Sequence, residues 1–150
     1  MSTADNKYLY NTYYEGKKLD DWISLIHREN SINNRWKTYM LKPYTYGYDC
    51  MAYTIASFFE YKNKNENWQN MNIDQLASIL HQFWTEIYIY WRDNQPWKKK
   101  NSPYKKPTHT LEDSRRMLLS MTKYEDLEEE EKEKSIVLAR IFETYFFNIM

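Results

Sequence analysis

The residues from Asn72 to Trp91 form the stretch that most constrains the fold. Asn72 can cap a helix at its start, and Gln75 can return the hydrogen bond to it. The apolar side chains that follow recur at steps of three and four residues, the period of an α-helix; they are Ile73, Leu76, Ala77, Leu80, Phe83, Trp84, Ile87 and Tyr88. Such a helix spans about 30 Å, most of a small domain. We expect the other helices to pack on it.

Helix signals also surround this central stretch, and no strand pattern competes with them. The other predicted helices cover residues 19–42 behind Asp20 or Asp21, 49–59 behind an Asp49 cap, 110–121 from a Thr110 capping box, and about 126–147. An aromatic turn around Gly47 separates the first two of these. The pattern predicts an all-α protein, a single compact domain of about five helices.

Two segments outside the predicted helices lack a sustained apolar period. Residues 1–18 combine several tyrosines with polar residues, and we expect them to form an extended aromatic arm. Residues 19–150 then form the helical domain. Its longest loop covers 93–109, where Pro96, Pro103 and Pro107 exclude a regular helix.

The chain is rich in aromatic residues, with 18% Phe, Trp and Tyr, including fifteen tyrosines. Tyrosine and tryptophan suit protein interfaces because they join a large apolar body to a polar tip. We therefore expect some rings to contact a partner protein. The residues predicted to do so are Tyr8, Tyr10, Tyr13, Tyr14, Tyr44, Tyr46 and Tyr48. Half-buried packing of the same rings is the alternative.

Charge and hydropathy restrict the setting. The 21 basic and 21 acidic residues give a net charge of zero, which argues against whole-surface binding to bulk DNA or to an anionic membrane. The polar first residues predict no secretory signal, and no apolar run approaches the roughly 20 residues of a membrane span. A single cysteine, Cys50, excludes an internal disulfide and favours an intracellular, reducing compartment.

Candidates for catalysis are few. His27, His81 and His109 form no spaced pair, so the sequence predicts no metal site, and His81 is expected to lie beside Trp84 on a half-buried helix face. Cys50 has no basic neighbour and indicates a buried small side chain. With two glycines there is no phosphate-binding loop, and we predict no cofactor. The sequence alone does not reveal a catalytic site assembled from residues that are distant in the chain.

One charged cluster stands out, between residues 97 and 107. It interleaves five lysines with two aromatic residues; the candidate nucleic-acid contacts are Trp97, Lys98, Lys99, Lys100, Tyr104, Lys105 and Lys106. Lysines on phosphates and rings on bases can hold a single strand without sequence preference. The competing interpretation is a flexible basic loop that docks on an acidic surface, either the chain's own Glu-rich helix or another protein.

Two segments carry a family resemblance. Leu76-Ala77, His81 and Trp84, followed by Tyr124-x-x-Leu127 and a Glu-rich run to Lys132, resemble the repeat domain first described in ryanodine receptors and also found in bacterial and viral proteins. The resemblance covers residues 73–147. It departs at Ser135-Ile136, where the family commonly has Asp-Arg, and at the 111–121 helix, which looks like an insertion. It implies a small helical module for contacts or ligand docking, with no catalytic residues to carry over.

Two functions follow as hypotheses. The first is a non-enzymatic structural or adaptor protein that acts through protein contacts, as a minor component of a large assembly such as a virus particle. The alternative is a nucleic-acid-binding accessory protein that uses the 97–107 loop.

Overall fold

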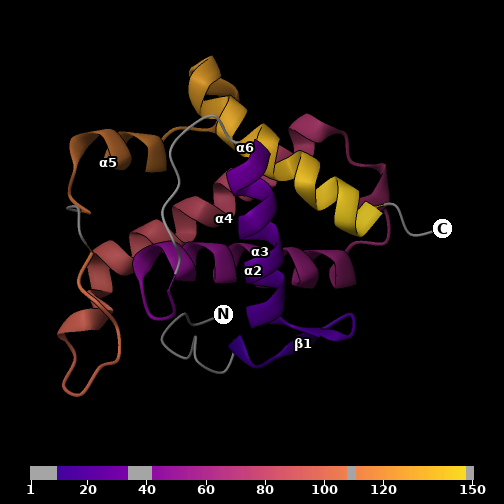
Figure 1. Ribbon diagram of the computed structural model, residues 1–150. Coiled ribbons are helices and arrows are strands. Elements are labelled where there is room, and N and C mark those ends of the chain that lie inside the picture. The colour runs from indigo at the N-terminus through magenta and orange to yellow at the C-terminus, as the bar shows by residue number, and fades with distance from the viewer. Residues whose placement is uncertain (1–9, 34–41, 108–110, 148–150) are drawn as a thin grey trace.

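Five α-helices dominate the computed structural model, which describes residues 10–33, 42–107 and 111–147 (Figure 1). The helices are α2 (Leu19–Asn33), α3 (Tyr46–Lys64), α4 (Ile73–Asn94), α5 (Ser114–Ser120) and α6 (Glu129–Phe142). Single helical turns lie at Trp68–Asn70, Pro96–Lys98 and Tyr124–Asp126, and a π-helical turn follows α6 at Glu143–Phe147. The predicted all-α, single-domain fold is confirmed. In the described residues, no helix has the length and apolar character that crossing a membrane requires.

The α4 helix contacts α3, α5, α6 and the turn at Tyr124–Asp126. Asn72 Oδ1 accepts a hydrogen bond from the Gln75 amide at 2.8 Å, and the Asn72 amide donates to Gln75 Oε1 at 2.9 Å. The predicted capping box is therefore present, and it holds the N-terminal end of the helix. The helix ends at Asn94 rather than at Trp91, so the central prediction is confirmed with a slightly longer helix.

The helices surround two adjoining hydrophobic clusters. The larger joins α2, α3, α4 and α6, and its centre is Phe58, which packs edge-on against Phe142 with ring centroids 5.1 Å apart. The smaller lies along the C-terminal half of α4 around Tyr88 and Trp91. Figure 1 shows α2 crossing in front of α3, and α2 contacts both α3 and α6.

Most tyrosines of the described residues lie inside the fold or partly inside it rather than on its surface. Tyr10, Tyr46 and Tyr48 are 5%, 8% and 5% exposed. Tyr14 and Tyr44 are half-buried. Among the tyrosines of the described residues only Tyr13, at 64%, is exposed. The expectation of surplus surface rings is therefore wrong for this part of the chain, and the three buried tyrosines present no ring to a partner.

Ring geometry explains how so many aromatic residues fit. Tyr10 packs edge-on against Tyr48 at 5.1 Å and against Tyr44 at 5.6 Å between centroids. Edge-to-face pairs place the positive edge of one ring on the negative face of the next, so clusters of rings stabilise one another. Composition alone does not reveal this arrangement, because the paired rings come from separate segments of the chain.

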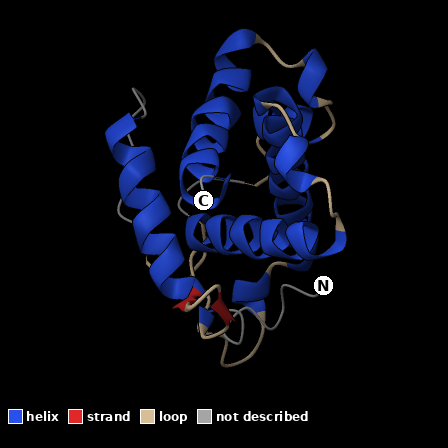
Figure 2. Ribbon diagram, turned by 90° about the vertical axis from the view of Figure 1, so that its right-hand side faces the viewer, coloured by secondary structure: helices blue, strands red, loops and turns tan. Residues whose placement is uncertain are grey.

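The predicted N-terminal arm is a folded hairpin over its described part. β1 (Tyr13–Tyr14) pairs antiparallel with β2 (Lys17–Lys18), and Figure 2 shows this pair in red at one end of α2. Tyr14 stacks on Phe59 at 4.8 Å, and the Trp22 indole donates to the Tyr14 carbonyl at 2.8 Å. These contacts hold residues 13–18 against the helices as a short hairpin. Tyr8 and the rest of 1–9 lie outside the described residues.

The start of α3 differs from its prediction. The helix begins at Tyr46, and the Thr45 hydroxyl caps it by accepting a hydrogen bond from the Tyr48 amide at 3.3 Å. Gly47 is therefore helical rather than the centre of a turn. Asp49 is not a cap either, since it lies inside the helix and is 1% exposed.

The later helices start after their predicted positions. Asp113 caps α5, because its Oδ1 accepts from the Arg115 and Arg116 amides at 3.0 and 3.2 Å. The helix is thus shorter than predicted, and the proposed cap at Thr110 lies outside the described residues. A single turn at Tyr124–Asp126 precedes α6, which begins at Glu129.

Candidate functional site

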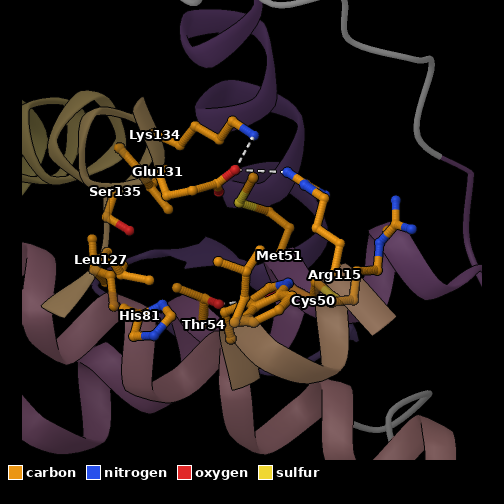
Figure 3. Close-up of a pocket in the computed structure, with 15 residues that line it drawn as sticks. Cys50, Met51, Thr54, His81, Arg115, Leu127, Glu131, Lys134 and Ser135 are labelled. Carbon is orange, nitrogen blue, oxygen red and sulfur yellow. Dashed lines mark hydrogen bonds and ion pairs between the residues drawn. The ribbon is translucent and has the colours of Figure 1, made fainter. Parts of the chain in front are cut away.

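A pocket of about 340 Å³ lies between α3, α4, α5 and α6 (Figure 3). Its floor and walls are mostly apolar, and its charged side chains come from α5 and α6. The lining residues are Gly47, Cys50, Met51, Thr54, Leu80, His81, Trp84, Arg115, Arg116, Leu119, Leu127, Glu131, Lys134, Ser135 and Leu138. Four helices that are separate in sequence build this site, so it depends on the whole fold.

The apolar part of the pocket comes from residues that helix periodicity places toward the core. Leu80 and Leu127 are 2% and 7% exposed, while Trp84, Leu119 and Leu138 are half-buried. The half-buried side chains present apolar surface to the cavity. A pocket with this kind of lining and a few polar groups is the usual form of a ligand or side-chain binding site.

An ion-paired cluster joins α5 to α6 at the pocket. Arg115 Nη2 donates to Glu131 Oε1 at 2.7 Å, and Lys134 Nζ donates to the same oxygen at 3.1 Å; Figure 3 draws both. Burial alone would raise the pKa of Glu131, but the hydrogen bonds from Lys134 and Arg115 outweigh it and lower that pKa. Glu131 is therefore a carboxylate at neutral pH, and the cluster ties it to α5 across the pocket.

Arg116 gives the pocket an excess of positive charge. It is half-buried, and it forms no ion pair with the carboxylates of the residues that the structure describes. The lining carries three basic side chains, Arg115, Arg116 and Lys134, against the single carboxylate of Glu131. The site therefore favours an anionic group beside an apolar one.

Two contacts hold the ring of His81 in place. Its Nε2 lies 2.8 Å from the Thr122 carbonyl oxygen, and the ring stacks on Trp84 at 5.9 Å between centroids. The predicted place beside Trp84 on a half-buried face is confirmed. Because the carbonyl oxygen only accepts, Nε2 carries the proton of this hydrogen bond. The ring is thus held in position by the fold.

Cys50 lines the pocket without the surroundings of a nucleophile. Burial raises the pKa of its thiol, and the hydrogen bond with Tyr46 offsets this only in part. The thiol is therefore protonated at neutral pH, whereas the thiolate is the reactive form. Within the described parts of the chain, no three His, Cys, Asp or Glu side chains are grouped so that they could hold a metal ion.

The basic loop turns its two rings toward the protein. Trp97 stacks on Trp91 at 5.7 Å, and Tyr104 packs edge-on against Trp91 at 5.7 Å and Tyr44 at 5.4 Å. The Lys105 amide also donates to the Tyr44 carbonyl at 2.8 Å. The loop lysines, in contrast, are all exposed: Lys98, Lys99, Lys100, Lys105 and Lys106. The ring-stacking half of the predicted strand-binding mode is therefore used within the fold.

A buried carboxylate joins three segments beneath this loop. Asp49 Oδ1 accepts from the Tyr10 hydroxyl at 2.5 Å, and Asp49 Oδ2 accepts from the Trp91 indole at 2.8 Å. Burial, followed by the charge of Asp49, raises the pKa of Tyr10, so this phenol stays protonated. This cluster is structural, and none of Tyr10, Asp49 and Trp91 lines the pocket described above.

Comparison with protein-family profiles, curated proteins and solved structures finds no match to this chain. The resemblance to the ryanodine-receptor repeat domain stays a prediction. Three of its residues, His81, Trp84 and Leu127, line the pocket.

The pocket contains none of the residues predicted to bind protein or nucleic acid. The sequence does not single out its charged residues, Arg115, Arg116, Glu131 and Lys134, because they come together only when α5 packs beside α6. One local signal was present: Arg115 and Arg116 are the only adjacent arginines in the sequence, and they directly follow a capped helix start.

Proposed function

We propose that the protein is a non-enzymatic adaptor that binds a side chain of a partner protein in the pocket between α3, α4, α5 and α6. The observation that carries this proposal is the apolar cavity of about 340 Å³ whose nucleophile and base candidates are both engaged elsewhere. Cys50 stays protonated, and His81 is bonded to a backbone carbonyl. What remains is a shaped apolar space with a cationic edge, which supports binding better than catalysis.

The surface of α5 supports the same function. Leu118 and Met121 are 62% and 73% exposed, in or directly after the short helix that supplies Leu119 to the pocket. Exposed apolar side chains near a cavity are a feature of protein docking sites. A partner segment that inserts one side chain can therefore gain further apolar contact on α5.

A binding module acts through the molecules that it brings together. The setting that we propose is accordingly a multiprotein assembly in a reducing compartment, with a virus particle as one such assembly. Cys50, a free and half-buried cysteine, supports the reducing compartment, since disulfides are rare there.

The test is a selection of random twelve-residue peptides, displayed on phage, against the immobilised full chain. Selected peptides, made synthetically, are expected to bind the protein and to lose at least about tenfold in affinity for Leu119→Trp, whose larger side chain fills the cavity. Isothermal calorimetry gives the affinities. Circular dichroism checks that the variant keeps its helices.

The control is Ile32→Trp, which adds an exposed indole on α2 at a residue that is 72% exposed and outside the pocket. It should leave the peptide affinity unchanged. If no peptide is selected, or if the selected peptides bind Leu119→Trp as tightly as the native chain, the proposed function is wrong.

Nucleic-acid binding is the weaker proposal. Five exposed lysines in the 97–107 loop support it, but Trp97 and Tyr104 pack within the fold. Binding would then depend on charge alone and fall steeply with salt. Changing all five lysines to glutamine should abolish the binding of a single-stranded oligonucleotide at low salt. No binding by the native chain under those conditions would remove this alternative.

A further inference from the structure

We infer that the partner segment carries a carboxylate next to its apolar anchor, and that Glu131 competes with this carboxylate for Arg115 of α5. The inference rests on the proposed function, since it names the chemistry of the segment that the same pocket binds. Three observations support it. They are the charge of the pocket lining, the geometry of the Glu131 cluster, and the lack of a carboxylate partner for Arg116 among the described residues.

The charge of the lining selects the sign of the ligand. Three basic side chains line the cavity together with one carboxylate, so an anionic group entering beside the apolar floor meets a net positive site. A guanidinium presents its donors in a planar fork that matches the two oxygens of a carboxylate. Arg116 is half-buried and has no carboxylate partner among the described residues, so it is available for this contact.

The Glu131 cluster shows which anion the site accepts. One oxygen of this side chain binds both Arg115 and Lys134, and the carboxylate is 21% exposed while Arg115 is 54% exposed. The protein thus already holds a carboxylate against one of its pocket arginines. A carboxylate from a partner has the same shape and charge, so it can take over Arg115 while Glu131 keeps Lys134.

This exchange lets the site bind an acid while Arg115 and Glu131 each keep an oppositely charged partner. Before binding, Arg115 is neutralised by Glu131, and after binding it is neutralised by the partner. Removing Glu131 would free Arg115 for the partner and add one unit of positive charge to the lining. Affinity for an acidic segment should then rise, and affinity for an uncharged segment should change little.

The test uses the peptides selected in the preceding section. We expect them to share an acidic residue within two positions of an aromatic or aliphatic one, and we expect the change from acid to amide to weaken binding about tenfold. Arg116→Gln should weaken the acidic peptide by a similar factor and leave the amide peptide unchanged. Glu131→Gln should strengthen the acidic peptide about threefold to tenfold.

The matched control is Glu129→Gln. This residue belongs to the same helix and the same acidic run, but its side chain is 92% exposed and it does not line the pocket. It should leave both affinities unchanged. If Glu131→Gln does not fold, a double-mutant cycle between Arg115→Gln and the acid-to-amide peptide still decides the inference, since a carboxylate that takes Arg115 over from Glu131 makes the two losses non-additive.

The outcomes separate the two proposals. Peptides that respond to Leu119→Trp but bind equally as acid and amide would overturn the inference and leave the adaptor function standing. Acidic peptides that bind Glu131→Gln no more tightly than the native chain would overturn the competition. A preference for phosphorylated over carboxylated peptides would also contradict the inference, because the site would then recognise a different anion.

Discussion

Replacing Asp49 by alanine is expected to lower the free energy of unfolding by about 3–5 kcal/mol. The carboxylate is 1% exposed and accepts hydrogen bonds from Tyr10 and Trp91. Without it, an indole N–H and a phenolic O–H remain in the interior with no acceptor. Each such donor costs about 1–3 kcal/mol, and the space left by the side chain adds to the loss.

The effect should also be cooperative, because Asp49 ties three segments together. Tyr10 belongs to the N-terminal segment, Asp49 to α3 and Trp91 to α4, at sequence separations of 39 and 42 residues. Tyr10→Phe removes one donor along with its bond, so it should cost only about 1 kcal/mol and lose that cost in an Asp49→Ala background.

Urea unfolding monitored by circular dichroism measures both losses. Asp126→Ala is the matched control, since Asp126 is exposed and lies in a single turn. Its effect should stay within about 0.5 kcal/mol. A cost below about 1 kcal/mol for Asp49→Ala would show that the carboxylate does not hold the segments together.

Lys62→Ala is expected to destabilise the protein by about 2–4 kcal/mol. The ammonium group lies over four rings, at 4.5 Å from Trp68, 5.2 Å from Phe59, 5.4 Å from Phe146 and 6.0 Å from Phe58. The Lys62 side chain is 8% exposed. Glu15 pairs with it from the hairpin turn. Alanine removes the cation–π attraction and leaves a space among the rings.

The source of this stability can be separated by a second substitution. Lys62→Met fills the same space without the charge, and replacing a largely buried charged side chain by an apolar one of similar size is often neutral. We expect Lys62→Met to stay within about 1 kcal/mol of the native chain. Glu15→Gln should destabilise the native chain, because it leaves the buried ammonium without its carboxylate, and should have no such effect in the Lys62→Met background.

Thermal and urea unfolding provide the measurement, and Lys64→Ala, an exposed lysine of the same helix, is the control. Equal effects of Lys62→Ala and Lys64→Ala would contradict the role of the aromatic surroundings.

The ion pair between Lys62 and Glu15 also accounts for an unusual turn. Glu15 has a φ of 49°, a conformation that a glutamate rarely adopts, and the contact with Lys62 compensates for the strain.

The features that the sequence predicts correctly are those that depend on contacts between residues close together in the chain. The α4 helix and its capping box depend on neighbours three or four residues apart, so Asn72 and Gln75 were assigned correctly from the sequence. Asp49 was misassigned because a carboxylate before an apolar run matches a helix cap. Its real partners are distant in sequence, and Thr45 already occupies the capping position.

The pocket could not be predicted for the same reason. It needs the faces of four helices, and the sequence shows only that each helix has a polar face and an apolar face. Glu131 looked like one of several equivalent glutamates, and its difference from Glu129 arises from the approach of Arg115 across the pocket. The aromatic residues were misread because their count says nothing of edge-to-face packing.

The stacking of Trp97 on Trp91 gives the protein an intrinsic optical reporter. Two indoles in close contact couple their electronic transitions, and one of them belongs to the lysine-bearing loop while the other is anchored in α4 beside a carboxylate. Lifting the loop would break the coupling and alter the near-ultraviolet circular dichroism. Engagement of the lysines by any ligand that moves the backbone can thus be followed without attaching a dye.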